Sequence, residues 1–150
     1  MDKRRNPKAK PSLRALGFQV WIHGRQFPDY QDYWDGNWLN VTIHCGSENS
    51  DVWISGAIIH LSDFISLKQD LDELSNSLKH TAMPDFIEPN LKMEFEVMSE
   101  QDIKMKVDLT PEHLWEAHSY SFEVNKEKLQ ACIREIEEVL NSYPVRGHPK

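Results

Sequence analysis

The residues best able to do chemistry gather between positions 24 and 38, in the segment GRQFPDYQDYWDGNW. Asp29, Asp32 and Asp35 could supply a general acid and base, or could bind a hard cation through carboxylate oxygens. Their spacing of three differs from an EF-hand loop, in which the first acids alternate at every second position. The sequence therefore leaves a small metal-dependent or acid/base hydrolase open as an alternative function.

Two further interpretations of this segment do not involve catalysis. In one, the aspartates form Asx-turns and keep an aromatic loop hydrated, while Trp34 and Trp38 fill the core. In the other, the acids steer a basic protein toward aromatic anchors, which supply much of the energy at protein interfaces. We favour a combination of these two interpretations. The candidate partner-binding residues are Asp29, Tyr30, Asp32, Tyr33, Trp34 and Asp35.

The histidines and cysteines predict neither a nucleophile nor a metal site. His44 and Cys45 are adjacent, but neighbours on a strand point to opposite faces, so they cannot act as base and nucleophile. Cys45 shares the parity of Leu39 and Ile43, which predicts a small core residue. The chain has only two cysteines and no CxxC pair. It therefore lacks the pattern of a zinc site or a disulfide framework.

Histidine spacing gives no stronger metal signal. His113 and His118 are five residues apart and so do not share a helical face. His23, His44 and His60 lie near strand-like runs and could converge only through the tertiary fold. Motifs of the P-loop, GxSxG, GxGxxG and HExxH types are absent from the sequence. We expect no catalytic residue, no metal ligand and no cofactor.

Two kinds of hydrophobic period predict the elements that position these residues. Apolar residues alternate with polar ones, as in half-buried strands, over 18–22, 39–45, 52–58, 91–97, 103–109 and 120–124. A period of three and four predicts two amphipathic helices. The first begins at Ser62 as N-cap, has Lys79 and His80 in its last turn and stops before Pro84. The second begins at Asn125 and runs to Tyr143.

Short turns between consecutive strands predict antiparallel hairpins. One joins 39–45 to 52–58, and another joins 91–97 to 103–109. In the second, acids on one strand should face lysines on the other across a wet face. The predicted fold is α+β, with an antiparallel sheet of about six strands and two amphipathic helices packed on one face.

Length and charge predict one acidic domain. At 150 residues the chain suits a single core. We expect a disordered basic tail at 1–16, an α+β domain at 17–144 and a flexible C-terminal tail at 145–150. Residues 1–14 carry six basic side chains and one acid, so the rest of the chain, at −12, is more acidic than the overall −7. Such a body repels nucleic acid and anionic lipid and attracts a basic protein.

No run of about 18 apolar residues predicts a membrane span, and the basic start is followed by no apolar signal core. We expect a cytoplasmic protein that binds neither nucleic acid nor membranes directly. Exposed sheet edges could pair two copies, while the charge opposes association, so we expect a monomer or a weak homodimer.

Several segments together resemble the WapI-type immunity protein family. They are Asp-Tyr-Trp-Asp-Gly-Asn-Trp-Leu at 32–39, the hairpin after it, the first amphipathic helix, Glu-Pro-Asn-Leu at 88–91 and the closing helix. The resemblance runs from about Phe18 to Tyr143. It implies a bacterial cytoplasmic antidote that binds the nuclease module of a polymorphic toxin and blocks it without catalysis. An orphan binding module with no toxin partner is an alternative.

The resemblance and the charge of the chain agree on the chemistry of the partner. Nuclease toxins hold phosphates and are commonly basic at the active cleft. The acidic body would suit such a cleft. We therefore expect the partner to be a cognate toxin with a basic nuclease domain.

Overall fold

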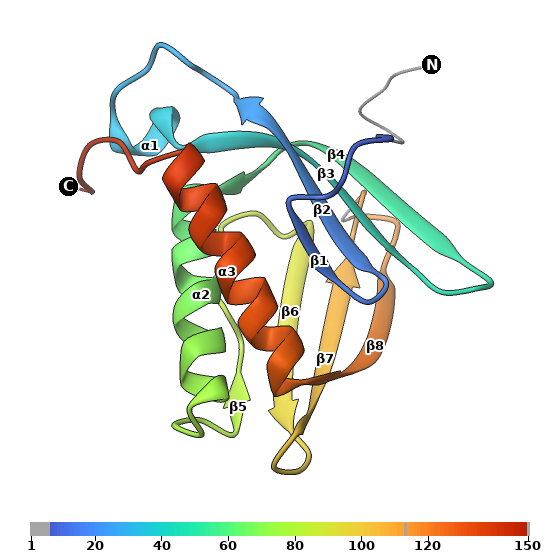
Figure 1. The fold of residues 1–150 in the computed structure, drawn as a ribbon. Coiled ribbons are helices and arrows are strands. Elements are labelled where there is room, and N and C mark those ends of the chain that lie inside the picture. Colours follow the sequence, from blue (N-terminus) through green and yellow to red (C-terminus); the bar gives the residue numbers. More distant parts are fainter. Residues whose placement is uncertain (1–6, 113, 150) are drawn as a thin grey trace.

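The computed structural model describes residues 7–112 and 114–149 and has an α+β architecture (Figure 1). One antiparallel sheet, sheet A, contains β1 (Leu13–Ala15), β2 (Phe18–Arg25), β3 (Trp38–Gly46) and β4 (Asp51–His60), in that order. A second, sheet B, contains β5 (Thr81–Ala82), β6 (Leu91–Val97), β7 (Asp102–Leu109) and β8 (His118–Asn125), in that order. The helices are α1 (Tyr33–Gly36), α2 (Leu61–Ser75) and α3 (Lys126–Ser142).

The α+β class was predicted correctly, but the single sheet of about six strands with two helices packed on one face was wrong, because the described residues form two four-stranded sheets and three helices. Each half of the chain forms its own four-stranded meander, and α2 connects the two. Both expected hairpins are present, as β3–β4 and β6–β7. β1 and β5 have only three and two residues, too few to show an alternating pattern. Alternation reports which face of a strand is buried, and it says nothing about which strands pair over long distances.

In sheet B the predicted face assignment is confirmed. Leu91, Met93 and Phe95 of β6 are buried, as are the alternating apolar residues of β7. On the opposite face Glu94 is paired with Lys106 in the strand register. Glu96 is likewise paired with Lys104. The wet face therefore places opposite charges across the strands, as the sequence indicated.

The two long helices lie side by side and share one core with both sheets (Figure 1). α3 presents Leu129, Ile133 and Ile136 to the core at helical spacing, and all three are buried. Burying each such side chain stabilises the fold by about 1.5 to 3 kcal/mol. Apolar residues from both sheets and both helices meet around one point; they are Leu13, Ala15, Phe18, Leu67, Leu71, Met93, Phe95, Met105, Leu129 and Cys132.

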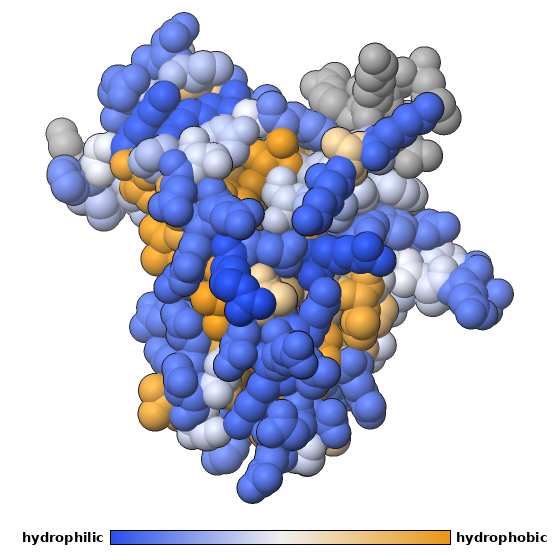
Figure 2. Space-filling view, in the orientation of Figure 1, coloured by the Kyte–Doolittle hydropathy of each residue, from blue (hydrophilic) through white to orange (hydrophobic). Residues whose placement is uncertain are grey.

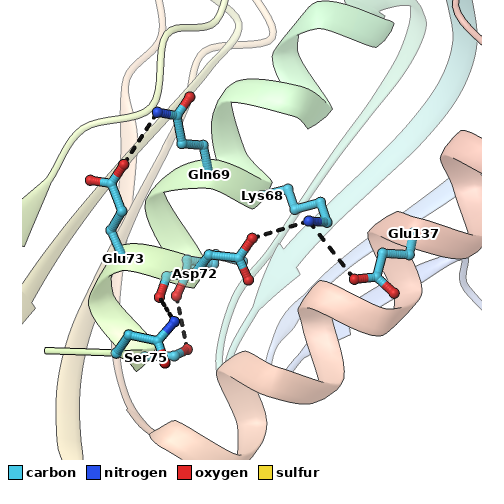
Figure 3. Close-up of polar contacts among 8 residues, drawn as sticks. Lys68, Gln69, Asp72, Glu73, Ser75 and Glu137 are labelled. Atoms are coloured by element: carbon cyan, nitrogen blue, oxygen red, sulfur yellow. Dashed lines mark hydrogen bonds and ion pairs between the residues drawn. The ribbon is translucent and has the colours of Figure 1, made fainter. Parts of the chain in front are cut away.

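Polar contacts fix the ends and the outer faces of the helices. Asn125 caps α3 as predicted, because its side chain accepts from Lys128 N at 2.8 Å. On the surface, Lys68 Nζ of α2 lies 3.0 Å from Asp72 Oδ2 and 3.8 Å from Glu137 Oε1 of α3 (Figure 3). An exposed pair of this kind adds little stability, so the apolar interface carries the helix packing.

The predicted boundaries of α2 were wrong at both ends. His60, not Ser62, is the N-cap, and Asp63 completes a capping box. The helix ends at Ser75. Asn76 Nδ2 donates a hydrogen bond to Asp72 O at 2.9 Å, and the backbone of Ser77 is left-handed, with φ 59°. The chain then turns back, and Lys79 pairs with Asp70 and Glu73 of α2.

The first ordered strand begins inside the segment expected to be a disordered tail. Leu13 and Ala15 are buried, and β1 pairs with β2, so this part of the prediction was wrong. Upstream, Trp21 Nε1 donates to Ala9 O at 2.6 Å, which holds the preceding segment against β2. Residues 1–6 of the expected tail lie outside the described residues. Within the described part, no helix has the length and apolar character that crossing a bilayer requires.

Candidate functional site

Residues 26–37, which we name the aspartate loop, connect β2 to β3 and contain α1. A hydrogen bond of 2.9 Å from Gln26 N to Trp38 O closes the base of the loop. The loop projects from the end of the molecule at which α2 begins and α3 ends (Figure 1). It carries all six candidate partner-binding residues.

The structure exposes five of these six residues. Asp29, Asp32 and Asp35 are exposed, and Tyr30 and Trp34 are 49% and 53% exposed. Tyr33 is half-buried. The expectation that Trp34 fills the core was therefore wrong, and Trp38 is only half-buried. The result is a surface of aromatic rings beside carboxylates.

One aspartate is structural as well as exposed. Asp32 is the N-cap of α1, and its Oδ2 accepts from Asp35 N at 2.9 Å. The predicted role of a turn-forming aspartate is confirmed at this position. No hydrogen bond or ion pair from the carboxylates of Asp29 or Asp35 is found within the described residues. Those two charges are available to attract a cation.

A buried asparagine holds the aspartate loop from behind. The side chain of Asn37 is fully buried, and its four hydrogen bonds all connect the loop to other segments or close the turn. Its Oδ1 accepts from Arg25 Nη1 at 3.1 Å and from Arg146 N at 2.9 Å. Its Nδ2 donates to Tyr33 O at 2.7 Å and to Arg146 O at 2.8 Å. A fully satisfied buried amide of this kind fixes a single loop conformation.

Two arginines extend this support to the loop carbonyls. Arg25 donates to Gly36 O at 2.6 Å and also to Pro144 O. Arg146 Nη1 donates to Pro28 O at 2.6 Å and to Tyr30 O at 2.7 Å. Burial, and then the neighbouring Arg146, lower the pKa of Arg25. The guanidinium groups thus bind loop carbonyls and leave the loop carboxylates facing outward.

The C-terminal segment is part of the site, contrary to the expected flexible tail at 145–150. Besides the contacts of Arg146, Gly147 packs against the loop with φ 65°. A Cβ at that position would lie 2.8 Å from Tyr33 N. Only glycine combines this left-handed conformation with such a close approach. Residues 144–147 therefore hold the aspartate loop in place.

His60 lies beneath the aromatic residues of the loop. The centroid of its ring lies 5.3 Å from that of Tyr33, 5.8 Å from that of Trp34 and 5.0 Å from that of Trp38. Nδ1 accepts from Ser62 N at 3.2 Å, so the proton is on Nε2, which donates to Tyr33 O at 3.1 Å. Burial lowers the pKa of His60. The neutral ring packs beneath Tyr33, Trp34 and Trp38 and supports them.

Asp63 anchors the start of α2 below this cluster. Its Oδ2 accepts from His60 N at 2.9 Å, and its Oδ1 accepts from Ile87 N at 3.2 Å. Burial raises the pKa of Asp63 from 3.8 to about 6. The folded state therefore keeps the proton of Asp63 over a pH range in which the unfolded chain has lost it.

The raised pKa of Asp63 predicts a measurable pH dependence of stability. The raised pKa of Asp63 adds to the free energy of unfolding. This contribution has its full value below about pH 4 and is lost as the pH rises through about 6. Relative to the variant Asp63→Asn, the free energy of unfolding of the native chain should fall by about 2 to 3 kcal/mol between pH 4 and pH 7. Urea unfolding of both proteins across this range measures the difference.

The matched variant also separates this effect from that of His60. A lowered histidine pKa works in the opposite direction, because its contribution is lost as the pH falls below about 6.5. His60 is present in both proteins, so its contribution cancels in the comparison. A difference between the two proteins that stays constant from pH 4 to pH 7 would refute the role assigned to Asp63.

Among the described residues, the other groups considered for catalysis or metal binding do not come together, and His113 lies outside the described residues. His44 and Cys45 face opposite sides of β3, as predicted: His44 Nε2 bonds Asp51 Oδ1 at 2.6 Å, whereas Cys45 is fully buried. Burial raises the pKa of Cys45 to about 12, so its thiol stays protonated. His23 bonds Thr42 at 2.8 Å. Over residues 7–112 and 114–149, no group of three or more His, Cys, Asp or Glu side chains could hold a metal ion.

A hollow of about 700 Å³ lies between α2, β5 and the solvent-exposed face of β6 and β7. Its charged side chains are mostly paired with one another. Lys79 lies 3.0 Å from Asp70, and Lys106 lies 4.0 Å from Glu94. The hollow thus has mixed charge, unlike the aspartate loop.

Several supporting residues of the site were not predicted from the sequence. Asn37 entered the sequence analysis only as part of the motif at 32–39, and no role was assigned to Arg25 or Arg146. Their signal lies in contacts between positions up to 119 residues apart, which one sequence does not reveal. The glycine at position 147 was a local sequence signal for the positive φ that the structure shows there.

Comparison with known proteins gives one match. A sequence model described as the Immunity protein WapI-like family matches residues 12–144. No curated protein and no solved structure matches the chain. The matched residues span both sheets, all three helices and the whole aspartate loop.

Proposed function

The chain belongs to the Immunity protein WapI-like family, and on this premise we propose that it binds a toxin protein and neutralises it through the aspartate loop. The toxin we propose is a nuclease with a basic active cleft, encountered in the bacterial cytoplasm. Neutralisation requires occupation of the cleft and no catalysis by this chain. The protein acts as a monomer or a weak homodimer.

One observation supports the aspartate loop as the binding surface. Tyr30 and Trp34 are half-exposed aromatic side chains on a loop whose backbone is fixed by Asn37 and Arg146. Fixing the loop before binding lowers the entropy lost on association. Aromatic side chains in such a setting are frequent energetic hot spots.

Charge supports a basic partner for the same surface. The loop contains three aspartates and neither lysine nor arginine. Carboxylates around aromatic anchors increase the rate of encounter with a cationic surface, and salt weakens this attraction. A nuclease cleft that holds phosphates presents such a cationic surface.

This proposal predicts that charge reversal slows binding. The double variant Asp29→Lys, Asp35→Lys should lower the affinity for the toxin module about tenfold or more at low salt, mainly through the association rate, and the loss should shrink at high salt. Stopped-flow mixing with the purified module, encoded by the reading frame next to this gene, measures both rates.

Two matched variants control for folding and for general charge. Asp32→Asn removes a charge but keeps the N-cap of α1, since asparagine caps as well as aspartate. Glu100→Lys reverses a charge in the β6–β7 turn, away from the loop. If the double variant binds like Glu100→Lys at every salt concentration, charge steering by the aspartate loop is wrong.

A further inference from the structure

The loop between β7 and β8 holds two very exposed apolar side chains. Trp115 is 80% exposed and Leu114 is 68% exposed. A single exposed leucine, such as Leu78 at 74%, is ordinary on a protein surface, but an exposed tryptophan next to an exposed leucine forms an apolar patch of the kind found at protein interfaces. These two residues are therefore candidates for contact with another protein.

A hydrogen-bonded turn holds this pair outward. Trp115 N and Glu116 N both donate to Glu112 O, at 3.0 and 2.9 Å. Leu114 N lies 3.4 Å from Glu112 Oε1. At the base of the loop, Thr110 Oγ1 donates to Pro89 O at 2.8 Å. These hydrogen bonds tie Leu114, Trp115 and Glu116 to Glu112, and they tie the base of the loop to Pro89.

A chain of contacts connects this loop to the aspartate loop. Leu61 N, at the start of α2, donates to Asn37 O at 2.9 Å. Two residues further along α2, Asp63 accepts from Ile87 N. Residues 85–90 then lead into β6, and Asn90 O accepts from Thr110 N at 3.0 Å. Residues 85–90 thus lie between the start of α2 and the end of β7.

The three segments at this end share one composition. Residues 26–37, 85–90 and 110–117 contain no lysine or arginine. Their acids are Asp29, Asp32, Asp35, Asp85, Glu88, Glu112 and Glu116. Their exposed apolar residues are Tyr30, Trp34, Ile87, Leu114 and Trp115. We name the described residues of these segments, 26–37, 85–90, 110–112 and 114–117, the acidic rim.

The helical face of the molecule is different in character. Figure 2 shows that the face formed by α2 and α3 is mainly hydrophilic, with hydrophobic residues in separate patches. Lysines and acids alternate there, as at Lys68 with Asp72 and Glu137. The rim segments combine exposed apolar side chains with acids and contribute no lysine or arginine, although Arg25 and Arg146 from neighbouring segments bind carbonyls of the aspartate loop. This composition distinguishes the rim from the helical face.

We propose that the acidic rim is one continuous docking surface for the toxin, with Trp115 and Leu114 as its second anchor beside Tyr30 and Trp34. This inference rests on the proposed function. It specifies a partner whose cationic surface is interrupted by an apolar recess that accepts Trp115. Charge complementarity selects the partner, and the two aromatic anchors hold it.

The test compares exposed apolar residues at the two ends of the molecule. Trp115→Ala and Leu114→Ala remove the second anchor. Leu78→Ala and Met98→Ala are matched controls, because both side chains are exposed and lie after α2 and in the β6–β7 turn. Equilibrium titration with the purified toxin module should show a loss of affinity of about tenfold or more for Trp115→Ala and changes within about twofold for the controls.

The outcomes separate this inference from the proposed function. If the native chain does not bind the toxin module, the proposed function fails and this inference fails with it. If the native chain binds and Trp115→Ala and Leu114→Ala match the two controls, the second anchor is refuted while the proposed function stands. Equal melting temperatures of all four variants exclude unfolding as the cause of any loss.

Discussion

Replacement of Asn37 by alanine is expected to lower the free energy of unfolding by about 2 to 4 kcal/mol. The change removes four side-chain hydrogen bonds from a fully buried position and leaves the main-chain groups of Tyr33 and Arg146 without these partners. Groups buried in this way lose their contact with water and gain nothing in return. Urea unfolding followed by tryptophan fluorescence measures the change.

A matched control is Asn49→Ala, in the exposed β3–β4 turn, where the structure gives the side chain no hydrogen bond. Its stability should stay within about 0.5 kcal/mol of the native chain. Asn37→Ala should also weaken toxin binding in conditions in which it remains folded, because the aspartate loop loses its fixed conformation. Equal stabilities of the two variants would contradict the role of Asn37 as the support of the loop.

The second large effect is expected at Trp34. Trp34→Ala should weaken toxin binding about 30- to 100-fold, which corresponds to about 2 to 3 kcal/mol. The ring is half-exposed in the free protein and lies within 5.8 Å of His60, so a partner can bury the remaining surface on an already ordered side chain. Equilibrium titration with the toxin module measures the loss.

Trp34→Phe should recover part of the affinity, since a smaller ring keeps the aromatic contact. Leu78→Ala again serves as the control for an exposed apolar side chain distant from the loop. A toxin affinity of Trp34→Ala within twofold of that of Leu78→Ala would exclude Trp34 as an anchor. That result would leave the rest of the acidic rim as the candidate surface.

Local chemistry explains which parts of the fold could be predicted. The β6–β7 hairpin, with Glu94 opposite Lys106, and the Asn125 cap of α3 depend on residues close together in sequence. The division into two sheets depends on pairing between distant segments, for which alternation provides no information. The end of α2 was misjudged because Leu78 continues the apolar period but follows the left-handed Ser77 and is exposed.

The same distinction applies to the candidate site. The composition of 26–37 predicted an exposed acidic and aromatic loop, and the structure has one. That its side chains contact a partner stays a prediction. The support from Arg25 and Arg146 joins segments far apart in the chain, and the sequence assigned no binding role to the second loop at 110–117. Its significance comes from the exposure of Trp115, a property of the folded chain.

Growth rescue tests directly whether this chain neutralises a toxin. The C-terminal module of a toxin-like reading frame adjacent to this gene is expressed in a host that lacks both proteins, alone, with the native chain, or with Trp34→Ala at equal abundance. Survival with the native chain, co-purification of the pair and reduced survival with Trp34→Ala are the expected results. Cell death in the presence of abundant, folded native chain would contradict the proposed neutralisation of this toxin.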